Sequence, residues 1–231
     1  MTIHDSRTFA SMISQMRIVH DSRNLTFSPV IRIVAKIVSY LFHPLFVPVY
    51  IGLFFIYEAR LFNDRTDWQN RIILIQFFVY YTFFPLMTTL LAKALGFIES
   101  VYLKTQKDRI LLYIVCEIFY FWAWYVFRNV HFPKEVVMFA LGVFLACSLG
   151  LILNSYLKIS MHTIALGVIC AFFLLAGMFS AASYGFYISV ALLIAGVTAT
   201  ARLIDSNHTQ KEIYSGFFAG VLAEVVAYFF V

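Results

Sequence analysis

The chain has 231 residues, of which 62% are hydrophobic and 13% are charged, and its mean hydropathy is +0.84. Since a water-soluble domain carries about a quarter charged residues, this composition excludes an ordinary soluble protein. The formal charge of +5 does not indicate nucleic acid as a partner either, because the basic residues are dispersed over loops and the amino-terminal arm instead of forming one basic face.

Two regions of different composition follow one another along the chain. Residues 1–30 form a polar arm, and residues 31–231 contain repeated apolar runs of membrane-spanning length. In hydrocarbon every backbone amide has to be hydrogen-bonded within its own segment, so the sequence predicts an all-α fold that forms a single polytopic transmembrane domain. We expect an integral, multi-pass protein of a bacterial inner (cytoplasmic) membrane, in contact with membrane lipids.

The first apolar run, residues 37–57, is about long enough to cross a bilayer. It contains His43, Pro44 and Pro48, so it is either a kinked crossing or a segment that only dips into the membrane. Six further spans are predicted at residues 72–95, 110–127, 136–157, 163–183, 187–200 and 213–231. The sequence therefore predicts six or seven transmembrane helices: hydropathy favours seven crossings, whereas the distribution of basic residues favours six.

A polar stretch, A-R-L-I-D-S-N-H-T-Q-K-E at residues 201–212, separates the last two spans. It contains Arg202, His208 and Glu212. Positions i and i+4 share one face of a helix, so Glu212 could hold the His208 ring and fix its tautomer. A helix that begins here also directs its free N–H groups and the positive end of its dipole at the same place. The stretch predicts an anion site, for phosphate, at a membrane surface.

Two other polar segments are predicted to lie on the same side of the membrane as this stretch. Two spans separate the loop at residues 104–109 from the break at residues 158–162, and two more separate that break from residues 202–212. An even number of crossings returns the chain to the same face each time. The three segments can therefore converge on one pocket.

The motifs in these segments resemble those of the type 2 phosphatidic acid phosphatase superfamily, the lipid phosphate phosphatases related to vanadium haloperoxidases. The third motif of that family, S-R-x5-H-x3-D, is matched in spacing by residues 201–212, with Ala201 for the Ser and Glu212 for the Asp. The second, P-S-G-H, is matched by I-S-M-H, in which Ser160 and His162 fit.

The first motif of the family, K-x6-R-P, is matched poorly. Arg109 can stand for its Arg, but Ile110 follows in place of Pro, and Tyr102 occupies the position of the Lys. Lys104 and Lys107 lie nearby, out of register. The resemblance covers roughly residues 100–220.

The resemblance implies a metal-independent phosphatase, without a cofactor, that acts on a lipid phosphate or lipid diphosphate through a phosphohistidine. His208 would be the nucleophile, Glu212 would orient it, and His162 would protonate the leaving alkoxide. The phosphoryl oxygens would be held by Arg202, Arg109, Ser160 and Lys104. These groups suit the chemistry, because phosphoryl transfer depends on positioning and on stabilising charge on the equatorial oxygens, and an imidazole can act as nucleophile or as acid and base.

Each of these residues also has a purely structural interpretation. Thr209-x-x-Glu212 is a capping box, Ser160 could cap the next helix, and Arg202 could extend to lipid headgroups. Gly216 and Gly220 form a G-x-x-x-G motif, which is either ordinary membrane packing or a specific scaffold for the adjacent loops. The remaining histidines are expected to be structural or solvated: His4, His20, His43 and His131.

Two acidic residues, Glu117 and Glu224, lie inside predicted spans, where an ionised carboxylate is costly. Glu117 either supports the basic loop at residues 104–109 from beneath or, as we expect, is protonated and hydrogen-bonded between helices, and Asn154 is expected to bond across helices as well. Two rival functions stay open. A catalytically degenerate relative that binds or moves a phospholipid is favoured by the departures from the motifs, and an unrelated small transporter is favoured by the two acidic residues.

Overall fold

The computed structural model describes residues 27–98, 100, 105–179, 184–205 and 208–231. The predicted all-α class is confirmed, since the regular elements in these ranges are helices and six helices are long and apolar enough to cross a membrane. The first of the six is Asp67–Ala94, which comprises α4 (Asp67–Phe78), the π-helical turn η3 (Val79–Phe83) and α5 (Phe84–Ala94). The others are α6 (Gln106–Asn129), α7 (Lys134–Asn154), α8 (Met161–Phe179), α9 (Gly185–Ile204) and α10 (Gln210–Phe230).

The apolar run predicted at residues 37–57 is not one continuous helix. It is divided between α2 (Pro29–Leu41), α3 (Val47–Leu53) and the π-helical turn η2 (Phe54–Glu58), with a non-helical break at residues 42–46. Pro44 lies in the break, where its ring and its missing N–H prevent the helix from continuing. The second half, Val47–Glu58, would be about 18 Å long, which is short of the ~30 Å hydrocarbon core.

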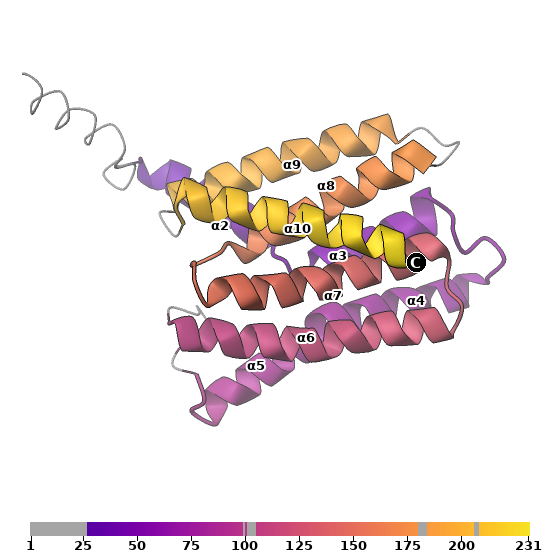
Figure 1. Cartoon of the computed structure of the whole chain (residues 1–231), viewed down its shortest axis with the longest axis horizontal. Helices are drawn as coiled ribbons and strands as arrows, with labels where there is room; N and C mark the ends of the chain where they lie inside the picture. Colours follow the sequence, from indigo (N-terminus) through magenta and orange to yellow (C-terminus); the bar gives the residue numbers. More distant parts are fainter. Residues whose placement is uncertain (1–26, 99, 101–104, 180–183, 206–207) are drawn as a thin grey trace, which may run out of the picture.

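The broken run nevertheless passes along the bundle. Figure 1 shows α2 beginning at the end of the molecule where α9 ends and α10 begins, and α3 running toward the opposite end. This path contains the kink that the prolines predict. It places the start of α2 on the same side as the predicted site.

The long helices alternate in direction, so that α6, α8 and α10 all begin at one end of the bundle (Figure 1). We call this the site end. The parity argument from the sequence is therefore confirmed for the described residues, because the starts of α6, α8 and α10, which follow the three polar segments, all lie there.

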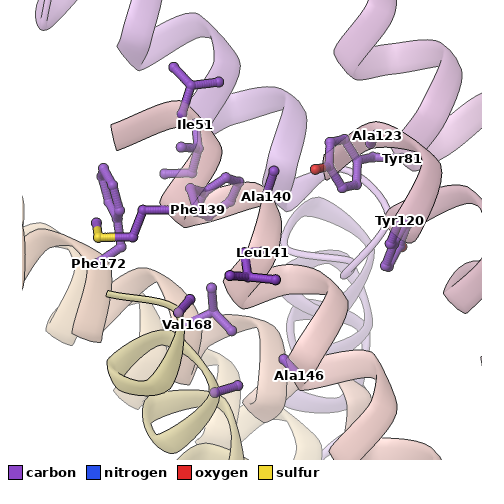
Figure 2. Close-up of a cluster of buried hydrophobic side chains, with 14 of the residues drawn as sticks. Ile51, Tyr81, Tyr120, Ala123, Phe139, Ala140, Leu141, Ala146, Val168 and Phe172 are labelled. Atoms are coloured by element: carbon purple, nitrogen blue, oxygen red, sulfur yellow. The ribbon is translucent and has the colours of Figure 1, made fainter. Parts of the chain in front are cut away.

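Aromatic and aliphatic side chains fill the centre of the bundle (Figure 2). Phe139 of α7 and Phe172 of α8 are 0% and 1% exposed, and their ring centroids are 5.6 Å apart. The ring of Phe55, from the end of the broken run, lies 5.9 Å from the first and 5.4 Å from the second. The segment after the break is thus anchored in the core, which fixes the position of the break.

Helices α8 and α10 pack with their backbones in contact at glycines. A Cβ atom added to Gly220 would overlap the carbonyl oxygen of Ile164, and one added to Gly167 would overlap that of Phe217. At Gly216 it would meet the carbonyl oxygen of Ser160 at 2.9 Å. The G-x-x-x-G motif therefore acts as a specific scaffold, since it holds the start of α10 against the start of α8.

Glu117 and Asn154 hydrogen-bond across helices, as predicted. The Ser148 hydroxyl of α7 donates to Glu117 of α6, and Asn154 of α7 accepts from Arg109 Nε at 2.9 Å. Glu224 is 0% exposed and lies against Gly142 of α7, where an added Cβ would overlap its carboxylate.

We expect Gly220→Ala to lower stability markedly, because the added methyl group forces α8 and α10 apart at a backbone contact; overpacking of this kind costs about 1–3 kcal/mol or more. Gly196→Ala in α9 is the matched control, since its Cβ would meet nothing within 4 Å, and alanine favours the helix by up to about 1 kcal/mol. The thermal midpoints of the detergent-solubilised variants measure the difference. Equal midpoints would contradict the close α8–α10 contact.

Candidate functional site

Three histidines and an arginine gather at the site end from four separate elements. His43 comes from the α2–α3 break, His162 from the first turn of α8, Arg202 from the last turn of α9, and His208 from the loop before α10. The guanidinium of Arg202 acts electrostatically on all three imidazoles, and His162 also interacts with the other two rings. The structure thus brings together the residues of the second and third motifs and adds His43 to them.

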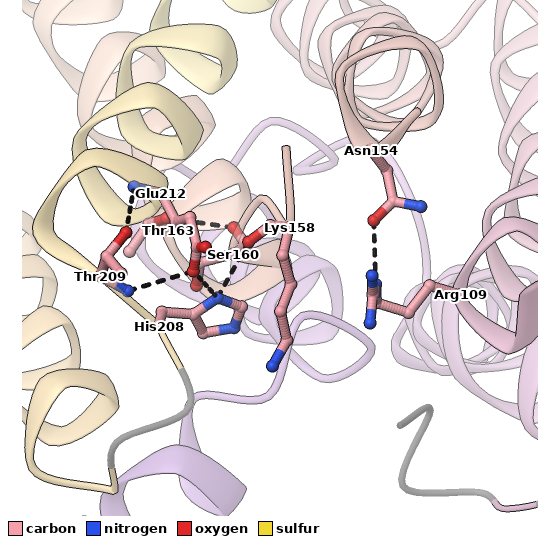
Figure 3. Close-up of polar contacts among 8 residues, drawn as sticks. All are labelled: Arg109, Asn154, Lys158, Ser160, Thr163, His208, Thr209 and Glu212. Carbon is pink, nitrogen blue, oxygen red and sulfur yellow. Dashed lines mark hydrogen bonds and ion pairs between the residues drawn. The ribbon is translucent and has the colours of Figure 1, made fainter. Parts of the chain in front are cut away.

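The pairing of His208 with Glu212 is present (Figure 3). Nδ1 of His208 lies 3.1 Å from Oε2 of Glu212 and 3.1 Å from the backbone oxygen of Lys158. Both partners are acceptors, so the proton of the neutral ring is assigned to Nδ1, which donates to them. The lone pair is consequently on Nε2.

Glu212 also caps the start of α10. It forms a capping box with Thr209: Glu212 N–H donates to the Thr209 hydroxyl at 3.4 Å, and Thr209 N–H donates to Glu212 Oε2 at 3.1 Å. The two interpretations of Glu212 from the sequence are therefore compatible, because the cap fixes the carboxylate that holds the His208 ring.

The surroundings of His208 favour its neutral form. Burial is the main cause and the nearby Arg202 charge the second, and together they lower the pKa of His208 to about 4, against the opposing effect of Glu212. The side chain is 8% exposed. At neutral pH the ring is therefore uncharged and has a lone pair on Nε2.

A pH dependence of stability follows from this pKa. Between pH 4 and pH 6.5 the unfolded chain binds more protons at His208 than the folded chain does, so stability is complete above pH 6.5 and falls as the pH drops toward 4, by up to about 3 kcal/mol. Thermal midpoints at pH 7 and pH 4.5 measure it. His208→Asn lacks this titration, and we expect its midpoint to fall less; parallel losses in the two proteins would count against a neutral buried ring.

His162 is held by the end of α2. Its Nε2 lies 3.0 Å from the carbonyl oxygen of Ser39 and donates to it, which leaves Nδ1 as the acceptor of the neutral ring. The ring of His43 packs edge-on against it, with the centroids 5.3 Å apart and the planes at 82°.

Arg202 is turned into the protein. Its side chain is 13% exposed, and its contact with Asp205 in the next turn is long, at 3.7 Å. Within the part of the chain that the structure describes, the buried Nε–H of Arg202 makes no hydrogen bond. Since buried donors are nearly always bonded, this N–H is a candidate for binding a ligand oxygen. Because the side chain is buried, contact with lipid headgroups does not account for this arginine.

Ser160 is 0% exposed, and its hydroxyl oxygen has no hydrogen-bond partner among the described residues. Its backbone oxygen instead accepts from the Thr163 hydroxyl at 3.0 Å and from Ile164 N–H at 3.1 Å. A side-chain cap of α8 by Ser160 is therefore not observed. The hydroxyl group is left as a second candidate for a ligand oxygen.

Arg109 and Lys104 are the other two predicted phosphate ligands. Nε of Arg109 donates to Asn154 at 2.9 Å, and Figure 3 shows its guanidinium directed at Asn154, with Lys158 in the view between it and His208. Lys104 lies outside the described residues. The structure thus joins Arg109 to the end of α7.

The sequence indicated a structural or solvated role for His43, and its contact with His162 was not predicted. The ring of His43 packs edge-on against that of His162. The signal that could have found it is the His43–Pro44 pair inside an apolar run, because an interrupted helix at membrane depth is tolerated only where it is buried in protein or lines a cavity.

An apolar groove of about 530 Å³ runs between α2 and α9 toward the site end. Its α2 wall includes Val34 and Val38, and its α9 wall includes Val197, Ala201 and Ile204. Arg202 lies between the last two in sequence. The side chains of Arg202, His43, His162 and His208 are not part of its lining. In the described ranges no group of three or more His, Cys, Asp or Glu side chains is placed to hold a metal ion.

The chain was compared with family models, curated proteins and solved structures, and nothing matched.

Proposed function

We propose that the protein is a membrane-embedded phosphatase that hydrolyses a lipid phosphate or lipid diphosphate through a phosphohistidine intermediate. The proposal is carried by one arrangement: His208, with Nδ1 bonded to Glu212, shares a polar cluster with Arg202 and His162. The resemblance of these residues to the motifs of the type 2 phosphatidic acid phosphatases supports the same activity.

In the first step, Nε2 of His208 attacks phosphorus and the bond to the leaving oxygen breaks. The lipid phosphate binds with one proton on its phosphoryl group; this proton passes to Nδ1 of His162 and from there to the leaving oxygen, so the lipid alcohol leaves neutral. In the second step, water attacks the phosphohistidine, its proton passes to Nδ1 of His162, and that proton leaves with the inorganic phosphate. Arg202 stabilises the charge on the phosphoryl oxygens in both steps, which is the main requirement of phosphoryl transfer.

The lipid character of the substrate is supported by the groove between α2 and α9. A hydrocarbon chain in this groove would lie against valine and isoleucine side chains, and its headgroup would have to extend to Arg202, which follows Ala201 of the groove wall in sequence. Prenyl diphosphates, phosphatidic acid, phosphatidylglycerol phosphate and phosphorylated glycolipids all have this form. The six apolar helices support an integral membrane location, and the proposal places the protein in a bacterial inner membrane.

The test is a screen for phosphate release from these lipid phosphates, by purified protein in detergent without added metal, with a water-soluble phosphate ester in parallel. We expect release from at least one lipid phosphate and its loss in His208→Ala. Lipid binding without release would instead favour a protein that binds or moves phospholipid.

A second candidate function, transport of a small solute, is favoured by Glu224. Both of its carboxyl oxygens are buried in α10 without a hydrogen-bond partner among the described residues, and acidic residues inside spans often mark ion or substrate pathways. Solute flux into vesicles that survives His208→Ala would support this candidate against the phosphatase.

A further inference from the structure

We propose that His43 is a third phosphate-binding imidazole of the site, whose Nε2–H donates to an oxygen of the phosphoryl group. The ligand is taken from the proposed function, and the placement of His43 is taken from the structure alone.

The break at residues 42–46 is a turn held by hydrogen bonds. The carbonyl oxygen of His43 accepts from Phe46 N–H at 2.8 Å and from Val47 N–H at 3.2 Å. On the other side, the Thr82 hydroxyl donates to the Leu45 oxygen at 2.6 Å. Interrupted helices in membrane proteins bind ligands at such positions, because side chains and free backbone groups meet there. The turn fixes the Cα of His43 beside the start of α8.

The hydrogen bonding within this turn shows which ring nitrogen of His43 is available to a ligand. Nδ1 of His43 accepts from Leu45 N–H at 3.3 Å, so the proton of the neutral ring is on Nε2. A donor is the group that a phosphoryl oxygen requires. His162 differs in this respect, because its Nε2 is already bonded to Ser39.

The neighbours of His43 are the groups already assigned to the phosphate. Its ring is edge-on to that of His162 at 5.3 Å, and Arg202 acts on it electrostatically. The first motif of the resembled family supplies two cations, but here Tyr102 takes the place of one and Nε of Arg109 is bonded to Asn154. His43 provides a donor from a part of the chain that none of the three motifs includes.

Two substitutions separate donation from packing. His43→Phe keeps a ring of similar shape against His162 but has no N–H, whereas His43→Gln loses the ring and keeps an N–H at about the position of Nε2. We expect kcat/KM for phosphate release to fall about 10²–10³-fold in His43→Phe and less than about 10-fold in His43→Gln. Packing alone predicts the reverse order, which would overturn the proposal.

Orthovanadate mimics the phosphoryl group in the transition state, so its binding gives a readout that does not depend on turnover. We expect its affinity, measured by titration of the purified protein, to fall at least about 10-fold in His43→Phe and to be retained in His43→Gln. If the wild type releases phosphate and His43→Phe does so equally well, the role of His43 is wrong and the phosphatase stands. If no lipid phosphate is hydrolysed but vanadate binding still requires the donor at residue 43, the phosphatase is wrong and the anion contact stands. Absence of vanadate binding to the wild type would overturn the contact.

Discussion

His208→Ala is expected to lower phosphate release by about 10⁴-fold or more, because without the imidazole no covalent intermediate forms and the remaining groups can only position the substrate. Radiolabelled lipid phosphate gives the direct measurement: an acid-labile, base-stable label on the wild-type protein, absent from the variant. The geometry behind the prediction is the 3.1 Å contact that fixes Nδ1 and leaves Nε2 free.

His131→Ala is the matched control for this substitution. His131 is exposed between α6 and α7, at the end of the bundle away from the site, so activity should be unchanged. Glu212→Gln separates the two roles of Glu212, since glutamine can complete a capping box but carries no charge. It should leave α10 folded and slow the reaction. Phosphate release that persists in His208→Ala at the wild-type rate would end the phosphohistidine proposal.

Arg202→Ala is expected to reduce kcat/KM about 10³-fold, since it removes the guanidinium that acts on all three imidazoles and that stabilises charge on the transferred group. Arg202→Lys should restore part of the activity, because it returns the charge without the two-pronged hydrogen bonding of arginine. Initial rates over a range of lipid phosphate concentrations provide the values.

The control for Arg202 is another arginine at a helix end. Arg128 lies in the last turn of α6 and stacks on Trp124 at 5.5 Å, on the side of the bundle away from the site. Arg128→Ala should leave kcat/KM within about 2-fold of wild type, as expected for a surface substitution. Equal losses in the two variants would show that Arg202 acts through stability and not through the substrate.

The local parts of the site were predictable from the sequence because they depend on short-range rules. The contact between His208 and Glu212 was predicted from i, i+4 spacing on a helix, but His208 precedes the N-cap residue Thr209, and the contact is made because the capping box positions Glu212. The capping box itself follows from its S/T-x-x-E pattern. Counting spans placed the three polar segments at one end. These inferences need helix periodicity and topology, but no knowledge of how the helices pack.

The remaining parts depend on packing between distant segments, which a single sequence does not determine. The prolines indicated a kink in residues 37–57, yet they do not specify that the turn contacts α8 and places His43 on His162. The bond from Arg109 to Asn154 likewise depends on the rotation of α6 against α7. In each case a side chain that could face several directions is fixed by a neighbour far along the chain.

The glycine contacts between α8 and α10 have a consequence for how the protein tolerates variation. The segments that carry His162 and His208 are held by backbone contacts between α8 and α10. The distance between the two rings is therefore set by the helix backbones and not by large neighbouring side chains. Drift in lipid-facing side chains leaves that distance unchanged, whereas one methyl group at Gly167 or Gly220 alters it. Substitutions on the lipid-facing surface should therefore have small effects on stability, whereas substitutions at the glycine contacts between α8 and α10 should have large ones.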